Sequence, residues 1–401
     1  MSKTLRTIFS ISIIFSFFTI FQSCIQNQKA KDLDIKPIEW AEKMANSVIT
    51  SYDSLINYND PDKIKWQYDV AMLGQAIDKL GYIDQKYSKY LEDYIQYFVE
   101  EDGSVKNYKM SDYNLDHINP AKNLFTLYKR TGEEKYLIAI HNFIKQLENQ
   151  PKTKSGGFWH KKRYPYQMWL DGIYMSSPFM AQYAKEFNKP EWFDTVAFQI
   201  ILIYKMTVDE STELLYHAWD ESKEQKWCDP VTGKSKQFWS RAMGWYAMAI
   251  VDVLDYFPEN HPKRNELITI LNNISEALLK VRDPETGLWY QVLDAGGKEG
   301  NYIEASGSSM FTYTFAKGFK KGYLPSKFYE TALYAFDAII EEFIRLDNSG
   351  LITVKGICGS AGLGGDPYRD GSYEYYINEK KVDNDPKGVA PFILAAIELK
   401  N

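Results

Sequence analysis

The sequence contains little of what a metal site or a nucleic-acid-binding surface requires. Its 401 residues include three cysteines and five histidines, and no CxxC, CxxxH or HExxH pattern occurs. A structural zinc and a catalytic metal are therefore not predicted. Acidic side chains outnumber basic ones by 53 to 47, and no basic stripe runs along the chain, so binding to nucleic acid is not expected either.

The residues that are abundant indicate a folded chain with a large core. Hydrophobic residues make up 45% of the sequence and aromatic residues 15%, too much for a disordered chain. The length allows one large domain or two of ordinary size. Cys228 and Cys358 could pair, but two cysteines among so many aromatic residues are more often buried singly, and we expect that here.

Long apolar runs are scarce, and the one that stands out lies at the start of the chain. Residues 8–21 follow a short basic segment and are almost entirely apolar, which is typical of an export signal and too short for a comfortable membrane span. The run ends in Phe21-Gln22-Ser23-Cys24, which resembles a bacterial lipoprotein cleavage site. We expect removal of residues 1–23, lipidation of Cys24, and a polar tether over 24–36. An ordinary cleaved signal with an incidental cysteine is the alternative.

This interpretation also predicts a location. A lipid-anchored chain would reside in the cell envelope, periplasmic or associated with the outer membrane. It would touch the membrane only through the lipid on Cys24, because the polar tether separates the anchor from the rest of the protein.

Beyond residue 37, helical patterns recur and are separated at regular intervals by short turns. One helix begins after Pro37, a last one covers Pro391–Leu399, and five pairs of helical segments lie between them. The pairs are broken by short turns at Gly81 and at residues 131–133, 188–190, 258–262 and 322–325. Six inner and six outer helices fit an all-α (α/α)6 barrel whose first and last helices pair, because closure buries the apolar face that no single pair buries alone. We expect one catalytic barrel domain over 37–401; a generic helical solenoid is the alternative.

The connections that precede the inner helices should gather on one face of this barrel. Residues 242–250 are small or apolar all round, which marks an inner helix that is buried on most sides. Unusual residues stand in such connections or at helix starts: Tyr68, Asp116-His117, Trp169–Asp171, Trp239–Arg241 and Glu304–Ser308. Their spacing follows the repeat, so we expect them to form the rim of a pocket.

Two carboxyl groups in this rim are candidates for proton transfer. Asp171 stands among large apolar side chains, including Met168, Trp169 and Met175, and such surroundings favour the neutral form that a proton donor needs. Asp116 is a candidate for a second carboxylate that faces Asp171, in which case the two titrations would be coupled. For each residue the alternative is a helix cap, since Asp is a favoured capping residue.

His160 and His217 occupy matching places in two repeats, and each precedes a tryptophan. Both residues stand in connections that lead to the rim. Contact with a ligand and an ordinary structural role are equally weighted alternatives for them. Trp239-Ser240-Arg241 and Trp245 place aromatic surfaces beside a guanidinium, a group that binds carboxylates in bidentate fashion. An acidic sugar would suit this combination; the alternative is a core tryptophan with a surface arginine.

Five stretches of the chain, spread over most of the length from about Trp40 to the C-terminus, carry a family resemblance. They are Trp66-Gln67-Tyr68, Leu115-Asp116-His117-Ile118-Asn119-Pro120, Met168-Trp169-Leu170-Asp171-Gly172, Trp239-Ser240-Arg241 with Gly244-Trp245, and Glu304-Ala305-Ser306-Gly307-Ser308. With them the chain resembles glycoside hydrolase family 105, the unsaturated rhamnogalacturonyl hydrolases. It resembles more distantly the unsaturated glucuronyl hydrolases of family 88.

The resemblance implies a fold, a substrate and a reaction. The fold is the barrel counted above. The substrate is a pectin or rhamnogalacturonan oligosaccharide, left by a lyase, whose terminal uronic acid (an unsaturated galacturonate) has a C4=C5 double bond. The reaction is hydration of this vinyl ether, after which the ring opens and releases the neighbouring sugar; no cofactor is needed. The alternatives are an inverting hydrolase that acts on a saturated glycan through Asp116 and Asp171, and a surface glycan-binding lipoprotein without activity.

By the same resemblance, Asp171 is the acid that protonates C4 and then accepts a proton from the attacking water. Asp116 holds sugar hydroxyls and helps to keep Asp171 protonated. Arg241 is the candidate for reading the uronate carboxylate, a role that His160-Lys161 could share. The substrate-binding set that the resemblance implies is Tyr68, Asp116, His160, Lys161, Trp169, Met175, His217, Trp239, Arg241 and Trp245.

Overall fold

The computed structural model describes residues 30, 33–58 and 64–400. Within these ranges, twelve helices of ten or more residues form the body of the molecule. They are α1 (Pro37–Ser51), α2 (Tyr68–Asp78), α3 (Gln85–Phe98), α4 (Lys122–Thr131), α5 (Glu134–Glu148), α6 (Leu170–Glu186), α7 (Glu191–Thr207), α8 (Ser240–Val253), α9 (Arg264–Lys280), α10 (Ala305–Lys320), α11 (Ser326–Phe343) and α13 (Pro386–Glu398). None of the described helices is long and apolar enough to cross a bilayer. The predicted signal peptide and Cys24 lie outside the described residues.

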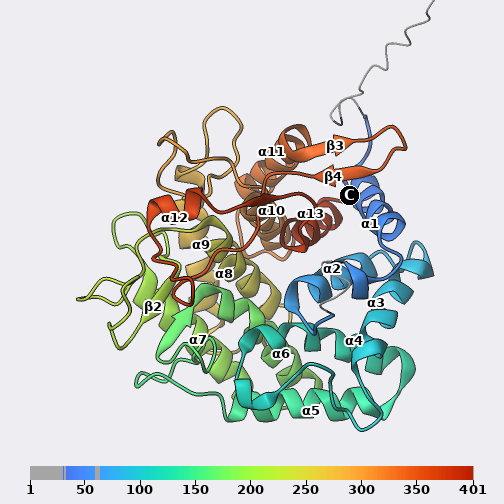
Figure 1. Cartoon of the computed structure of the whole chain (residues 1–401), viewed down its shortest axis with the longest axis horizontal. Helices are drawn as coiled ribbons and strands as arrows, with labels where there is room; N and C mark the ends of the chain where they lie inside the picture. The colour runs from blue at the N-terminus through green and yellow to red at the C-terminus, as the bar shows by residue number, and fades with distance from the viewer. Residues whose placement is uncertain (1–29, 31–32, 59–63, 401) are drawn as a thin grey trace, which may run out of the picture.

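Six of these helices form an inner ring. α6 packs against α8, α8 against α10, α10 against α13, and α13 against α2. α4 contacts α6, and the short 3-10 helix Asn119–Ala121 that precedes α4 contacts α2. Each inner helix also packs on an outer neighbour, and α13 has α1 beside it (Figure 1). The predicted all-α (α/α)6 barrel, closed by its first and last helices, is confirmed.

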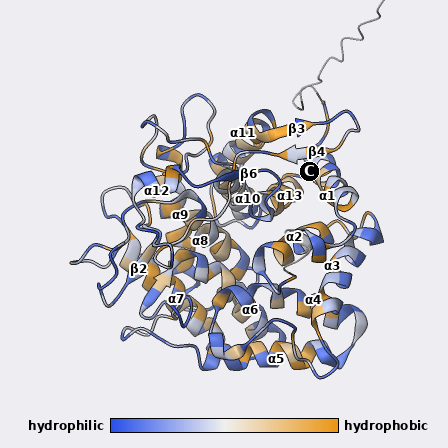
Figure 2. Ribbon diagram, viewed as in Figure 1, coloured by the Kyte–Doolittle hydropathy of each residue, from blue (hydrophilic) through white to orange (hydrophobic). Residues whose placement is uncertain are grey.

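The inner helices are buried on nearly all sides, as the composition of residues 242–250 predicted. Thirteen of the fourteen residues of α8 are buried, against seven of the seventeen in its outer partner α9. Outer helices have two faces, and α5 carries both hydrophobic and hydrophilic residues (Figure 2). Its buried residues Tyr136, Ile140, Phe143 and Leu147 recur every three or four positions, the spacing of one helix face.

The last helix begins five residues earlier than predicted. α13 starts at Pro386, after Asp385, whose carboxylate accepts the backbone N–H of Lys387 at 2.9 Å. Pro391 lies inside the helix rather than at its start and removes one main-chain hydrogen bond. Twelve of the thirteen residues of α13 are buried, and this packing keeps the helix continuous through the proline.

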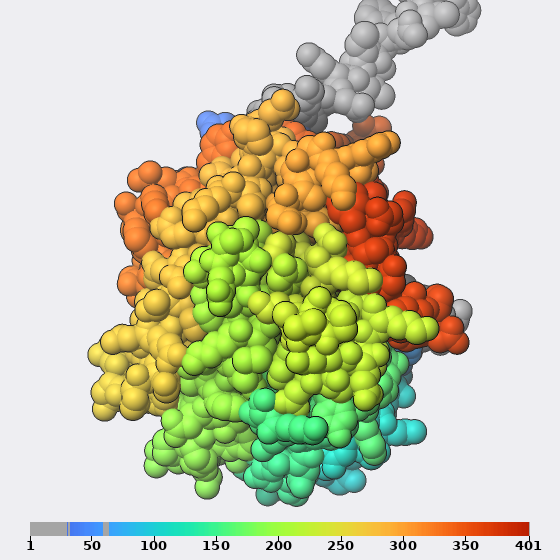
Figure 3. Space-filling view, turned by 90° about the vertical axis from the view of Figure 1, so that its left-hand side faces the viewer, coloured from blue at the N-terminus to red at the C-terminus, as the bar shows by residue number. Residues whose placement is uncertain are grey.

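In the described ranges, the connections hold three short antiparallel sheets and one further α-helix. β1 (Gln167–Trp169) pairs with β2 (Ala218–Asp220), β3 (Ile344–Leu346) with β4 (Ile352–Val354), and β5 (Ile357–Cys358) with β6 (Lys381–Val382). The five-residue helix α12 (Tyr373–Ile377) was not expected from the sequence. The segments around β2 and α12 lie side by side on the surface (Figure 3), where Trp227 donates its backbone N–H to the hydroxyl of Tyr368 at 3.1 Å. Cys228 and Cys358 are free and buried, as predicted.

Candidate active site

The sheet formed by β1 and β2 places Asp171 beside His217. Trp169 pairs with Ala218 across this sheet, and the backbone N–H of Leu170 donates to the carbonyl of His217 at 3.1 Å. Because α6 begins at Leu170, Asp171 falls in its first turn. Nε2 of His217 lies 3.1 Å from Oδ2 of Asp171. The register of two three-residue strands thus joins two side chains that are 46 residues apart.

Neither candidate carboxyl group is a helix cap. The N-cap of α6 is Trp169, which makes no capping bond. The 3-10 helix Leu115–His117 is capped by Asn114, whose side chain accepts the N–H of Asp116. The side chains of Asp171 and Asp116 are 15% and 18% exposed, so a ligand can reach both. The capping alternative is therefore wrong for both residues.

Asp116 is held as a carboxylate by Lys161, and His160 is a second contact. Its Oδ2 accepts a hydrogen bond from Nζ of Lys161, and its Oδ1 lies 3.4 Å from Nε2 of His160. Burial alone would raise the pKa of Asp116, but Lys161 and the neighbouring histidine outweigh burial and hold this pKa below its ordinary value. Asp116 is therefore an ionised hydrogen-bond acceptor at neutral pH. Its part in keeping Asp171 protonated stays a prediction.

His160 is a buried and neutral imidazole. Its ring stacks on Trp169, with centroids 4.7 Å apart and an interplanar angle of 13°. Burial, which Asp116 opposes only in part, lowers the pKa of His160 to about 4. Its Nδ1 atom faces Gly172, where a Cβ atom would lie 2.9 Å away. The glycine that follows Asp171 is therefore needed for the close approach of α6 to this ring.

Replacing His160 by Gln is expected to reduce the loss of stability on mild acidification. The unfolded chain protonates this histidine below about pH 6.5, whereas the folded chain does so only near pH 4. The unfolded state therefore binds more protons between these values, and stability falls as the pH drops. The contribution near pH 5 is about 2 kcal/mol relative to pH 8. Urea unfolding at both pH values measures it, and equal losses in the wild type and in His160→Gln would contradict the expectation.

The start of α2 supplies Tyr68 to the same place. The pKa of its hydroxyl is raised well above the ordinary value, first by burial and then by charges that include Asp69, Asp116 and Asp171. The charges of both candidate carboxyl groups therefore act on Tyr68. Its ring contacts Trp245 edge-on, with centroids 6.0 Å apart. Trp245 is itself 1% exposed, so it supports Tyr68 from within the barrel.

Arg241 is buried rather than exposed. Its side chain is 1% exposed, and the fully buried carboxylate of Glu304 lies 3.8 Å from one guanidinium nitrogen. Nε donates to the hydroxyl of Ser306 at 2.9 Å, and the other nitrogens donate to the carbonyls of Cys358 and Gly359. The alternative of a surface arginine is therefore wrong. The sequence suggested that this guanidinium binds a substrate carboxylate. In the structure it is bound by Glu304, by Ser306 and by two backbone carbonyls.

The remaining predicted residues differ in exposure. Trp169, Met175 and Trp239 are at most 5% exposed, whereas the side chain of Lys161 is 13% exposed. Beside Lys161 the surface is hollowed over a volume of about 550 Å³. This hollow is lined by Ser111, Asp112, Asn114, Lys161, Lys162 and Arg163. Asp116, Lys161 and Asp171 are each partly exposed, so they can form hydrogen bonds to a polar ligand, and Asp171 can exchange a proton with it.

The profile of Glycosyl Hydrolase Family 88 matches residues 40–401 of this sequence. The chain belongs to this family.

Relatives of this family 88 chain agree with its membership. A solved glycoside hydrolase of family 105 from C. acetobutylicum ATCC 824 has 46% sequence identity and a TM-score of 0.86, and the match covers 90% of this chain and 99% of that chain. The unsaturated rhamnogalacturonyl hydrolase YesR of Bacillus subtilis is 25% identical over 69% of this chain and 76% of its own length. The unsaturated glucuronyl hydrolase of Bacillus sp. GL1, at 12% identity, shares the fold with a TM-score of 0.67 over 91% of this chain and 96% of that chain. The resemblance to family 105 seen in the sequence is confirmed.

This family 88 chain has a site residue that the sequence did not reveal. Oη of Tyr376, on α12, lies 2.6 Å from Nδ1 of His217, although the two residues are 159 positions apart. Five residues are too few for a helical period to be recognised, and no motif surrounds them. The aromatic run Tyr373-Glu374-Tyr375-Tyr376 is the one signal that could have drawn attention to this segment.

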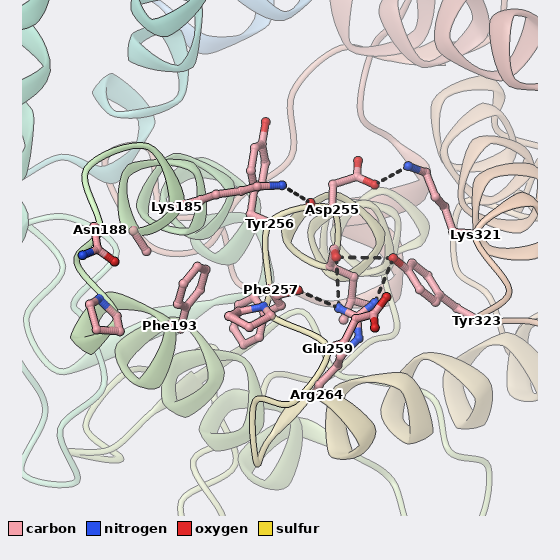
Figure 4. A pocket seen from close by; sticks show the side chains of 14 residues that line it. Lys185, Asn188, Phe193, Asp255, Tyr256, Phe257, Glu259, Arg264, Lys321 and Tyr323 are labelled. Carbon is pink, nitrogen blue, oxygen red and sulfur yellow. Dashed lines mark hydrogen bonds and ion pairs between the residues drawn. The ribbon is translucent and has the colours of Figure 1, made fainter.

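A second pocket of this glycosyl hydrolase lies at the opposite end of the barrel. It has a volume of about 580 Å³ and is lined by the end of α6, the starts of α7 and α9, and the turns that follow α6, α8 and α10 (Figure 4). Lys185, in its wall, stands fourteen residues after Asp171 on α6, which is about 21 Å along a helix. Lys185 donates to the carbonyl of Asp255 at 3.2 Å, and Lys321 pairs with the Asp255 carboxylate at 2.9 Å. This pocket contains none of the predicted residues, so we place the active site at the end of the barrel that carries β1 and β2.

Proposed function

We propose that this glycoside hydrolase removes a 4,5-unsaturated uronic acid, an unsaturated galacturonate, from lyase-generated pectin or rhamnogalacturonan oligosaccharides. The observation that carries the proposal is the state of Asp116. Hydrolysis of an ordinary glycoside needs two carboxyl groups free to act, one as acid and one as base or nucleophile. Both oxygens of Asp116 face a basic side chain, Lys161 or His160. Asp171 is contacted by His217 at Oδ2 alone, which leaves its Oδ1 free for proton transfer. Hydration of a vinyl ether needs only one. The name of the relative YesR supports the same substrate class.

In the proposed reaction Asp171 first donates its proton to C4 of the unsaturated ring. The positive charge that forms at C5 is stabilised by the ring oxygen. A water molecule adds to C5 and returns a proton to the Asp171 carboxylate, so the acid is regenerated. The product is a hemiketal that opens and releases the neighbouring sugar. Proton transfer by a positioned side chain contributes about 10²–10⁴-fold to such a rate, and binding in the correct orientation supplies the rest.

The other residues of the site position the sugar. Asp116, held ionised, accepts hydrogen bonds from sugar hydroxyls, and its charge acts on the hydroxyl of Tyr68. The side chain of Arg241 is 1% exposed and contacts Glu304, whereas that of Lys161 is 13% exposed. We therefore assign the uronate carboxylate to Lys161, which can contact it while it holds Asp116. The second sugar then lies in the hollow that begins at Lys161.

We also propose that the chain is exported and anchored in the cell envelope through a lipid on Cys24. The support is the basic and apolar start of the chain followed by Phe21-Gln22-Ser23-Cys24. Fractionation of cells that produce the full chain tests this proposal: the mature protein belongs in the membrane fraction.

Incubation with unsaturated disaccharides tests the proposed reaction. We expect the ultraviolet absorbance of the conjugated enol-ether carboxylate to disappear, because hydration removes the double bond. Saturated disaccharides with the same second sugar are the matched controls and should stay intact. Release of sugar with the absorbance preserved would support an inverting hydrolase instead, and binding without turnover would support a glycan-binding protein. A panel with different second sugars then defines the specificity.

A further inference from the structure

The hydroxyl of Tyr376 is held in one place behind His217. Its oxygen lies 2.6 Å from Nδ1 of His217, and its ring stacks on Trp239 with centroids 5.9 Å apart and an interplanar angle of 30°. The carbonyl of Tyr376 accepts a hydrogen bond from Nε2 of Gln291 at 3.1 Å. Tyr376 and His217 are both fully buried. Asp171, His217 and Tyr376 therefore form a chain of two hydrogen bonds that runs inward from the partly exposed carboxyl group.

The positions of the hydrogens in this chain follow from which groups lack other partners. In the part of the chain that the structure describes, the Tyr376 hydroxyl makes no second hydrogen bond. Burial, with smaller contributions from Tyr375 and Asp171, raises the pKa of Tyr376 well above its ordinary value, so this hydroxyl stays protonated. If Nδ1 of His217 donated to Tyr376, the phenolic hydrogen would be buried without an acceptor, which is costly. Tyr376 must therefore donate to Nδ1, and the ring hydrogen of a neutral His217 sits on Nε2.

We propose that Tyr376 is a positioning residue that selects the Nε2–H tautomer of His217 and thereby keeps the catalytic proton of Asp171 on Oδ1. In this tautomer Nε2–H donates to Oδ2 of Asp171, 3.1 Å away, so Oδ2 is an acceptor and the acidic hydrogen occupies Oδ1. The described residues make no hydrogen bond to Oδ1 of Asp171. That oxygen is therefore free to face C4 of the sugar.

The same tautomer suits both proton transfers of the proposed function, on which this inference rests. When Oδ1 gives its proton to C4, the new carboxylate keeps the Nε2–H bond at Oδ2, and Oδ1 then receives a proton from the attacking water. With the opposite tautomer, Nε2 would be an acceptor. The acidic hydrogen would move to Oδ2 and be held by His217, away from the substrate.

A comparison of Tyr376→Phe with Tyr375→Phe tests the catalytic consequence. The first variant removes the hydroxyl that bonds His217; the second removes a hydroxyl one residue away, which accepts the N–H of Gly362 at 3.0 Å. We expect Tyr376→Phe to lower kcat by about 10- to 100-fold, the effect of one lost hydrogen bond in a charged network. KM should stay near the wild-type value, because Tyr376 is sealed behind His217. Tyr375→Phe should retain kcat. Wild-type kcat in Tyr376→Phe, or an equal loss in Tyr375→Phe, would overturn the inference.

The tautomer can also be measured without any substrate. Nitrogen-15 NMR of histidine-labelled protein at alkaline pH distinguishes the two neutral forms, and the His217 signals are those that are missing in His217→Gln. We expect Nε2–H in the wild type and a mixed population in Tyr376→Phe. Nδ1–H in the wild type would overturn the inference even if Tyr376→Phe fails to fold. If the wild type hydrates no unsaturated disaccharide although its His217 carries Nε2–H, it is the proposed function that fails.

Discussion

Asp171→Asn is expected to lower the rate of hydration by about 10²–10⁴-fold, because it removes the only proposed proton donor. An amide cannot protonate a carbon atom, and it cannot accept a proton from water at neutral pH. The substitution keeps the shape of the side chain. The amide oxygen can still accept the Nε2–H of His217, which lies 3.1 Å from Oδ2 in the wild type. The fold and the bound geometry should therefore survive, and the loss should fall on kcat.

Two measurements separate this loss of chemistry from a loss of structure. The ultraviolet absorbance of an unsaturated disaccharide reports turnover, and the shift in Tm on adding the same disaccharide reports binding. Asp337→Asn, an exposed carboxylate on the outer helix α11, is the matched control and should behave as the wild type in both. We expect Asp171→Asn to keep the Tm shift and to lose turnover. Full activity in this variant would remove Asp171 from the role of acid.

The barrel could be read from the sequence because its helices repeat a simple physical pattern. Residues 242–250 are apolar all round and lie in a helix with thirteen buried residues. The turn at 131–133 begins at the last residue of α4, and the turn at 188–190 falls between α6 and α7. The start of α13 was misplaced because Pro391 is a common helix starter, and only the packed structure shows that burial keeps the helix continuous through it.

The sequence predicts which residues belong to the site better than it predicts which neighbours they contact. His217 lies beside Asp171 because β1 pairs with β2. His160 lies beside Asp116 because its backbone carbonyl accepts the N–H of Leu115 at 3.1 Å. The sequence predicts that Arg241 contacts the ligand. It cannot show that the buried carboxylate of Glu304, a whole repeat later, lies 3.8 Å from the guanidinium. Tyr376 was missed because its segment, 159 residues beyond His217, returns to the site through an aperiodic connection. Long-range pairings of this kind depend on packing and leave no periodic trace.

Arg241→Met is expected to cost about 3–5 kcal/mol in the free energy of unfolding, because it leaves the buried carboxylate of Glu304 without its cation. The side chains of both residues are at most 1% exposed, so water cannot replace the guanidinium. The carbonyls of Cys358 and Gly359 lose a donor in the same step. Methionine fills a similar space without charge, so the loss measures the broken network rather than a cavity.

Urea unfolding of Arg241→Met and of the double variant Arg241→Met/Glu304→Gln tests this argument. The double variant should recover part of the loss, since the uncompensated charge is gone. With the single variant Glu304→Gln, these proteins form a double-mutant cycle that gives the coupling energy of the pair. Lys263→Met removes an exposed pair with Glu266 at 2.9 Å and should change stability by no more than about 1 kcal/mol. A stable Arg241→Met protein with a strongly raised KM would show that the guanidinium turns toward the ligand. In that case Arg241, rather than Lys161, would be the residue that reads the uronate carboxylate.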